Sequence, residues 1–353
     1  MHADDLDRGG IPVLFLSPAV VRDAQMIRSS VVRSCGLALL ALGLPLRGFA
    51  VNVADFVDYS LQNASNQVLL PGRLYTPPEA QLPGAGPRPL MIFLAGSGAN
   101  GTNNLAQLNQ VTDLMMEEAK DRGAFLYVPQ TTSTWSSQVV TDRVMTMVDR
   151  AIGTLNADTN RVYLTGYSLG SYGTWTMLSR YDGRFAAAIP LSGGIVQSDF
   201  VASRLIDMPI FTLHSRNDPT ASVSATRSVL NSILTAAHEP LPTYLAGNNP
   251  ATFVMSNATI PFHAEFRELV HKSENSIDFL LADPKLDLLY YEPQLGGHST
   301  LGAFNSPVLY DWLFAHSLAV PEPNVFSMLL IAAVVSAIPT RPPRQRKLAV
   351  RLI

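Results

Sequence analysis

A serine between two glycines is the feature of this sequence with the clearest chemical meaning. Residues 166–170 read Gly-Tyr-Ser-Leu-Gly; a β-type run at residues 161–165 precedes them and a helical pattern at residues 171–180 follows. On a tight strand-to-helix turn a serine projects its hydroxyl above the sheet, and flanking glycines let strand and helix approach. The pattern predicts a nucleophile elbow centred on Ser168. The alternative is a glycine-rich turn with a spectator serine.

A serine hydroxyl is a weak nucleophile that needs a base, and the base needs an orienting acid. In elbow architectures the chain order is serine, then acid, then histidine, each on a loop after a strand. Asp218 follows the apolar run at residues 209–213 and fits the acid role, with an N-cap beside Pro219 as the alternative. Other carboxylates lie too near the elbow, at a strand start or in the closing helix: Asp182, Asp199, Asp287 and Asp311.

His298 is the best candidate for the base. It follows the strand-like run at residues 288–291 and the Gly296-Gly297 turn, and it precedes the closing helix. Such a glycine-flanked loop suits a general base, although a surface histidine is the alternative. The other histidines after Asp218 lack this setting: His238, His263, His271 and His316. We expect His316 to be structural and His214 to support the acid loop.

An oxyanion formed during acyl transfer needs two backbone N–H donors. The first expected donor is Leu169, directly after the serine, and the second comes from Gly96 or Ser97 in the glycine-rich loop after residues 90–94. A phosphate-binding loop is the alternative, but the Lys and Ser/Thr of a P-loop are missing. Tyr167 and Trp135 are candidates for the substrate pocket.

The elements that would position these residues alternate between strand and helix. Apolar runs occur at residues 68–75, 90–94, 124–128, 161–165, 185–191, 209–213 and 288–291, and helical patterns occur at residues 105–122, 139–155, 171–180 and 309–316. This alternation predicts an α/β fold with a mostly parallel, doubly wound sheet and helices on both faces. The site is expected at the carboxyl ends of the strands.

Six motifs, taken together in order, resemble the secreted α/β-hydrolase esterases, the feruloyl-esterase and polyhydroxybutyrate-depolymerase-like group often labelled phospholipase/carboxylesterase. They are PLMIFLAGSGANGTNN, FLYVPQ, RVYLTGYSLGSYGTW, RFAAAIPLSGG, PIFTLHSRNDP and GGHSTLGAF with LYDWL. The resemblance covers about residues 66 to 316. It implies an α/β-hydrolase fold, ester hydrolysis and the triad Ser168, Asp218 and His298.

The chain departs from the pattern of this group at three points. Ala95 stands where the group has histidine, Ser171 stands where it has a second glycine, and Asp218 and His298 are widely separated. The separation indicates an insertion at about residues 240–284, either a lid or substrate wall or a surface insertion.

The two ends carry targeting signals rather than parts of the catalytic domain, which we place at residues 51–319. Residues 1–50 contain basic Arg28 and Arg33, an apolar run at residues 35–46 and small residues before Val51. This pattern predicts a signal peptide, and we expect translation to start at Met26. Residues 320–353 combine Pro-Glu-Pro, an apolar segment at residues 325–338 and a basic tail. This segment resembles a PEP-CTERM sorting signal, which implies recognition by an exosortase-type processing enzyme; a C-terminal transmembrane anchor is the alternative.

Composition narrows the class of function. Between residues 51 and 320, 15 Lys and Arg against 23 Asp and Glu give a net charge of about −8, which disfavours nucleic acid and anionic lipid as partners. The single cysteine, Cys35, lies in the signal segment, so we expect no disulfide and no cysteine nucleophile. No cluster of His and Cys suggests a metal, and we expect no cofactor.

The sequence predicts an exported serine hydrolase of a Gram-negative bacterium, at the cell surface or in the extracellular matrix. Its substrate would be an ester, with acylated polysaccharide and polyester as the candidate classes. A prolyl-oligopeptidase-like serine peptidase shares the elbow and the triad. A catalytically inactive hydrolase fold that binds the matrix is an alternative from a different class.

Overall fold

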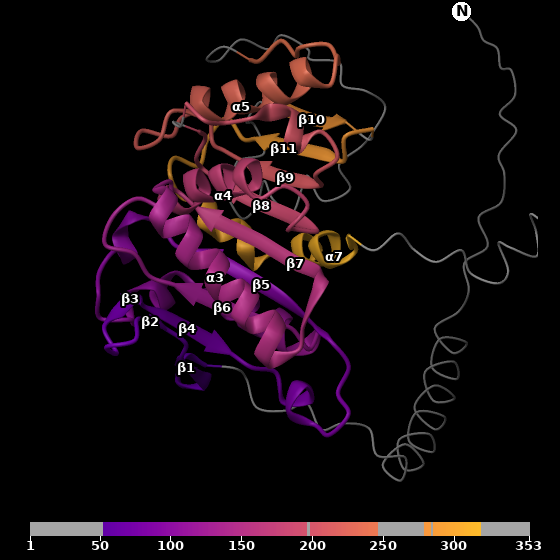
Figure 1. Ribbon diagram of the computed structural model, residues 1–353. Helices are drawn as coiled ribbons and strands as arrows, with labels where there is room; N and C mark the ends of the chain where they lie inside the picture. The colour runs from indigo at the N-terminus through magenta and orange to yellow at the C-terminus, as the bar shows by residue number, and fades with distance from the viewer. Residues whose placement is uncertain (1–51, 196–197, 246–278, 284, 319–353) are drawn as a thin grey trace, which may run out of the picture. The chain divides into compact units, whose positions relative to one another are not determined.

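Six parallel strands, buried on both faces, form the centre of the main sheet (Figure 1). In spatial order they are β6 (Phe125–Pro129), β5 (Arg88–Leu94), β7 (Ala157–Tyr167), β8 (Ala187–Leu191), β9 (Ile210–Leu213) and β11 (Leu288–Glu292). Their sequences are continuous apolar runs because helices cover both faces of the sheet.

The protein is described by a computed structural model at residues 52–195, 198–245, 279–283 and 285–318. Within that part of the chain, the predicted mostly parallel α/β sheet is confirmed.

Antiparallel strands flank this parallel centre and complete a nine-stranded sheet in the described part of the chain. On one side β4 (Gly72–Tyr75) pairs with β6, and β1 (Phe56–Asp58) pairs with β4. On the other side β10 (Phe279–Asp283) pairs with β11. The run expected at residues 68–75 is divided at Pro71, because β3 (Val68–Leu70) instead pairs with β2 (Leu61–Gln62) in a separate two-stranded sheet.

Helices lie against both faces of the main sheet, as the sequence predicted. One apolar core contains residues of α3 (Gln138–Leu155), α4 (Leu169–Arg180) and α5 (Val223–Ala236), which lie together on one face (Figure 1). A second core contains residues of α2 (Asp113–Asp121) and α7 (Pro307–Phe314). Short 3₁₀ turns occur at Val53–Asp55, Pro78–Gln81, Ser97–Ala99, Ala106–Gln110, Ala202–Leu205 and Thr300–Asn305.

Two segments differ from their predicted structure. The helix expected at residues 105–122 is interrupted, because Val111 is extended and the Thr112 side chain caps α2 by accepting a hydrogen bond from Met115 N at 3.1 Å. Strand β10 lies inside the insertion expected at residues 240–284, so the end of that segment extends the main sheet. Helix α5 was not predicted, although Ser222 provides an N-cap signal before it.

Several predictions fall on residues outside the described part of the chain. They are the signal peptide at residues 1–50 with its start at Met26, the sorting segment at residues 320–353, and residues 246–278 of the insertion, including His263 and His271. Among the described residues, no helix combines the length and apolar character needed to cross a membrane.

The close packing of α4 onto the sheet depends on glycine. A Cβ atom on Gly170 would lie 1.8 Å from Leu94 O, and a Cβ atom on Gly166 would lie 2.4 Å from Gly170 O. Both neighbours are backbone atoms that cannot move without displacing a central strand or the helix. Any larger residue would therefore separate α4 from β5 and β7.

Alanine substitutions at two helical glycines should have opposite effects. Gly170→Ala should lower the free energy of unfolding by about 3 kcal/mol or more, because its methyl group overlaps backbone. A methyl group added at Gly153 in α3 would meet no atom within 4 Å, so Gly153→Ala should raise the free energy of unfolding by about 0.5–1 kcal/mol. Urea denaturation of the two variants checks both signs. A stable, unchanged Gly170→Ala protein would contradict the packing argument.

Candidate active site

Ser168 occupies a strained backbone conformation at the junction of β7 and α4. Its φ of 54° and ψ of −118° lie where residues with a side chain are rarely found. Hydrogen bonds hold the turn: Ser168 N donates to Leu191 O at 2.9 Å, and Ser171 N donates to Ser168 O at 2.9 Å. This is the strand-turn-helix corner that the glycine pattern predicted.

The structure brings the three predicted side chains into contact. His298 Nε2 lies 2.8 Å from Ser168 Oγ, and His298 Nδ1 lies 2.6 Å from Asp218 Oδ2. In the tautomer that suits both contacts, Nδ1–H donates to the carboxylate and Nε2 accepts the serine proton. The arrangement can take a proton from Ser168 and stabilise the imidazolium that results.

Asp218 is a buried carboxylate with several hydrogen-bond donors. Its side chain is fully buried, and Thr220 N and Ala221 N donate to Oδ1 at 2.8 and 2.9 Å. Burial alone would raise the pKa of Asp218, but hydrogen bonds from His214, His298 and these two N–H groups outweigh it and hold the pKa well below its usual range. The carboxylate is therefore charged wherever a histidine can act as a base.

His214 lies beneath the acid loop, in the supporting position that we expected. Its Nε2 is 3.3 Å from Asp218 Oδ2 and 3.0 Å from Ala221 O, and its Nδ1 is 2.7 Å from Thr226 Oγ1. Asp218 thus contacts two imidazoles, one buried and one facing Ser168.

Two other histidines that follow Asp218 in the sequence lie away from the candidate triad. His316 Nε2 is 2.7 Å from Asp287 Oδ2, and His238 follows the end of α5.

Two contacts fix the loop that carries His298. Asn217 Oδ1 accepts a hydrogen bond from Gly297 N at 2.8 Å. Asn217 directly precedes Asp218 and Gly297 directly precedes His298, so this bond joins the two loops next to the candidate acid and base. The Tyr167 hydroxyl donates to His298 O, and the Tyr167 ring centroid lies 5.3 Å from that of the imidazole. Tyr167 therefore lies beside the candidate triad, and its role as a pocket wall stays a prediction.

A buried charge cluster joins the acid loop to the histidine loop. Glu292, fully buried at the end of β11, accepts hydrogen bonds from Arg216 Nε and Arg227 Nε at 2.8 Å and from Tyr290 Oη at 2.6 Å. Arg216 N also donates to Pro293 O at 2.8 Å. Because Arg216 precedes Asp218 and Pro293 precedes His298, this cluster sets the separation of the two loops.

The expected oxyanion donors need one correction. Leu169 and Ser97 are the first residues of their helical turns, where N–H groups have no partner within the helix. Gly96 N, in contrast, donates to Gln110 Oε1 at 2.7 Å, so Gly96 is not an available donor. The candidate donors are therefore Leu169 and Ser97, and Gln110 fixes the backbone directly before Ser97.

Trp135 does not line a substrate pocket, contrary to the prediction. It is only 2% exposed, and its Nε1 donates to Ala95 O at 2.8 Å. The indole instead joins the loop after β6 to the start of the glycine-rich loop after β5, which carries Gly96 and Ser97 and is called the oxyanion loop below. It also packs against α4, since a Cβ atom on Gly173 would lie 2.2 Å from Trp135 Cβ.

Sequence reasoning missed the residues that support the site. Gln110, Asn217 and Glu292 contact residues that are 14, 80 and 76 positions away in the chain, and no local pattern marks them. The contact of His214 with Asp218 had a local signal, because the two residues lie four apart in one loop. Among the described residues, no group of three or more His, Cys, Asp or Glu side chains could hold a metal ion.

Comparisons with known proteins place this geometry in a known fold. No family profile matches the sequence. The chain superposes on the crystal structure of a thermostable esterase with a TM-score of 0.53 and 23% identity, over 75% of this chain and 64% of that one. A Pyrococcus horikoshii acylaminoacyl peptidase gives a TM-score of 0.41 and 13% identity over 53% and 36% of the two chains. The chain has an α/β-hydrolase fold.

One sequence relative is similar over a shorter region. A bifunctional acetylxylan esterase/xylanase of Neocallimastix patriciarum is 33% identical over 110 residues, which are 31% of this chain and 16% of that protein. The aligned region therefore represents a small part of the relative's length.

The low pKa of Asp218 predicts how stability depends on pH. An unfolded aspartate titrates near pH 3.9, so the contribution of Asp218 is fully present above about pH 4 and is lost as pH falls through the depressed folded pKa. We expect Asp218→Asn to lower the free energy of unfolding at pH 6, and the two proteins to converge toward pH 2. Urea denaturation between pH 2 and pH 6 measures this.

Asp311→Asn is the matched control, because the Asp311 side chain is 68% exposed beside Arg122. Its stability should differ from that of the wild type by less than about 0.5 kcal/mol across the same range. If the difference in free energy of unfolding between wild type and Asp218→Asn stays constant from pH 6 to pH 2, the low pKa of Asp218 is disproved.

Proposed function

We propose that this protein is a serine hydrolase that cleaves carboxylic esters through Ser168, His298 and Asp218. One observation carries the proposal. The strained elbow presents Ser168 Oγ 2.8 Å from His298 Nε2, while Nδ1 of the same ring lies 2.6 Å from a buried carboxylate. Nucleophile, base and orienting acid are thus in reach of one another without a loop movement.

The reaction would proceed in two halves. Ser168 Oγ attacks the ester carbonyl carbon while His298 Nε2 takes its proton, and the oxyanion faces the N–H groups of Leu169 and Ser97. The C–O bond to the alcohol breaks, the imidazolium returns the proton to the leaving alkoxide, and an acyl-Ser168 ester remains. Water then loses a proton to His298 Nε2 and attacks the acyl carbon. The bond from this carbon to Ser168 Oγ breaks, the imidazolium returns the proton to Oγ, and the carboxylic acid leaves.

An ester fits better than a peptide as the substrate. The region of 33% identity belongs to a protein whose name includes acetylxylan esterase. Acylated polysaccharide and polyester are the substrate classes that we favour. The sequence of the two ends supports export to the cell surface or extracellular matrix of a Gram-negative bacterium, with processing by an exosortase-type enzyme. A prolyl-oligopeptidase-like peptidase and an inactive matrix-binding protein are the competing functions.

Ser168→Ala should lower kcat on p-nitrophenyl acetate by about 10⁶-fold, because the nucleophile is lost. Wild-type protein should be labelled at Ser168 by a fluorophosphonate probe, and mass spectrometry of the labelled peptide identifies the site. Ser299→Ala, an exposed serine next to His298, is the control and should retain labelling.

A panel of p-nitrophenyl esters and aminoacyl anilides separates the competing functions. Hydrolysis of esters at a kcat/KM at least about 100-fold above that of anilides supports the esterase. A higher kcat/KM on anilides than on esters would show that the protein is a peptidase instead. Folded protein that neither reacts with the probe nor turns over any ester would make the inactive binding protein the correct function.

The contact between Gln110 and Gly96 should matter for rate more than for substrate binding. Gln110→Ala removes the side chain that fixes the backbone before Ser97, and we expect kcat to fall about tenfold with little change in KM. Asn109→Ala, at an exposed neighbouring position, should leave both constants unchanged. Equal kinetics for the two variants would exclude a positioning role for Gln110.

A further inference from the structure

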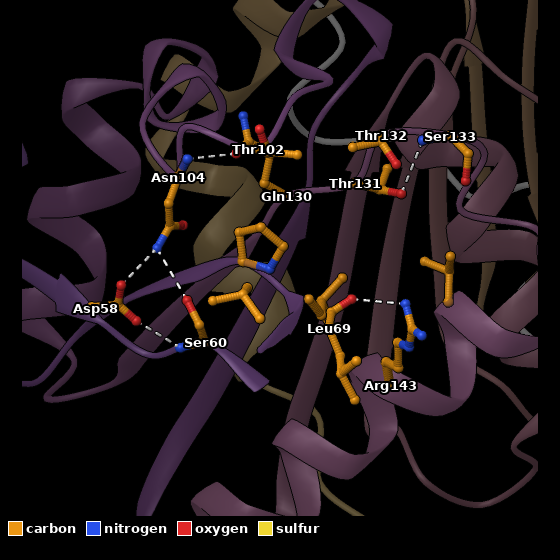
Figure 2. A pocket seen from close by; sticks show the side chains of 14 residues that line it. Asp58, Ser60, Leu69, Thr102, Asn104, Gln130, Thr131, Thr132, Ser133 and Arg143 are labelled. Atoms are coloured by element: carbon orange, nitrogen blue, oxygen red, sulfur yellow. Dashed lines mark hydrogen bonds between the residues drawn. The ribbon is translucent and has the colours of Figure 1, made fainter. Parts of the chain in front are cut away.

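A cavity of about 400 Å³ with both polar and apolar lining lies beside the loop that follows β5 (Figure 2). Its lining comes from four regions: the end of β1 with the segment up to β4, the loop after β5, the loop after β6, and the first turns of α3. The side chains include hydroxyls, amides, one carboxylate and one guanidinium, together with an apolar group formed by Val68, Leu69, Leu70, Pro71 and Val140.

One wall of the cavity is a preformed hydrogen-bond network. The Asn104 amide donates to Asp58 Oδ2 and Ser60 Oγ at 3.2 Å, and Asn104 N donates to Gln130 Oε1 at 2.7 Å (Figure 2). Ser60 N donates to Asp58 Oδ1 at 3.0 Å. Because these groups already satisfy one another, the wall is rigid before any ligand enters, and the cost of ordering it on binding is small.

The opposite wall offers hydrogen-bonding groups to a ligand. Figure 2 shows Arg143 beside Leu69, with Thr131, Thr132 and Ser133 above them. Arg143 Nη1 donates to Leu69 O at 2.7 Å, and among the described residues no carboxylate forms an ion pair with this guanidinium. Thr132 and Ser133 are exposed. With one cation and one anion on opposite walls, the cavity favours a ligand that is polar and without net charge.

The same cavity is joined to the loop that carries Ser97. Gln130 Nε2 donates to Ala99 O at 3.0 Å, Gly101 N donates to Thr131 O at 2.9 Å, and Asn100 Nδ2 donates to Ser133 O at 3.2 Å. A ligand held against Gln130, Thr131 and Ser133 would therefore contact the residues that hold the oxyanion loop in place.

We propose that this cavity binds a sugar residue of an acylated polysaccharide chain, as a subsite separate from the candidate triad. A sugar ring presents hydroxyls around its edge and C–H groups on its faces, which match the polar walls and the apolar group around Pro71. The proposal rests on the proposed ester hydrolysis for the other part of the substrate.

Strand order sets how the chain of sugars would lie. The cavity follows the carboxyl end of β6, and β5 separates β6 from β7, which ends beside Ser168. Neighbouring strands are about 4.8 Å apart, so the cavity and the nucleophile are separated by roughly 10 Å across the sheet. The acylated sugar would therefore be a different unit from the one in the cavity, and an oligosaccharide would be bound better than a monosaccharide ester.

Binding can be measured without hydrolysis by titrating the Ser168→Ala protein with unacylated xylotriose and cellotriose and following NMR chemical shifts. We expect saturable binding of at least one of them. Thr132→Trp fills the cavity from an exposed position and should weaken binding at least tenfold. Thr235→Trp, at an exposed position on α5, is the matched control. Combined with Ser168→Ala, it should bind the trisaccharides as tightly as Ser168→Ala alone does.

Kinetics of the otherwise wild-type protein provide an independent test. Thr132→Trp should raise the ratio of KM for acetylated xylo-oligosaccharides to KM for p-nitrophenyl acetate at least fivefold, whereas Thr235→Trp should leave that ratio unchanged. Failure of both trisaccharides to bind, or equal binding by Thr132→Trp, would overturn the sugar subsite even where esters are hydrolysed. Trisaccharide binding by a protein that hydrolyses no ester would instead support the subsite and reject the hydrolase.

Discussion

The backbone at Ser168 is the constraint on which the rest of the site depends. A non-glycine residue at φ 54° and ψ −118° is unfavourable by about 1–3 kcal/mol and persists only where its surroundings fix it. Here the fixing element is the contact of α4 with β5 and β7, which leaves no space for a Cβ atom on Gly170 or Gly166. Because α4 cannot move away from the sheet, the Ser168 hydroxyl remains above the strand ends, where His298 meets it.

The other two members of the candidate triad need support of a different kind. Asp218 and His298 lie 80 residues apart on loops without regular structure, and loops alone hold side chains poorly. Glu292 compensates, because a buried carboxylate held by two guanidinium groups fixes the positions of both loops. Such a cluster is costly to desolvate and contributes little net stability, so its value lies in fixing one arrangement. The contact from Asn217 to Gly297 then sets the final separation.

Sequence patterns predicted the residues whose setting is local. Ser168 was marked by its flanking glycines, Asp218 by its place in the loop after a strand, and His298 by a strand and the Gly296-Gly297 turn. The structure places all three in contact. Contacts between distant segments had no such mark, which is why Gln110 and Glu292 were missed and Gly96 was assigned a free N–H. Trp135 was misjudged because an aromatic residue after a strand suits a pocket wall and a buried clamp equally well. The edge strand β10 was hidden within a long segment of mixed character.

The position of the cavity gives a physical reason for joining the proposed sugar binding to the proposed ester hydrolysis. Binding energy from a part of the substrate remote from the reacting bond accelerates the reaction only when it is expressed in the transition state. The Ser97 backbone belongs to a loop whose far side is hydrogen-bonded to Gln130, Thr131 and Ser133, the residues that line the cavity. A ligand there would restrain that loop in the geometry that serves the oxyanion. Distance from Ser168 therefore does not separate the cavity from the chemistry, since one short loop borders both.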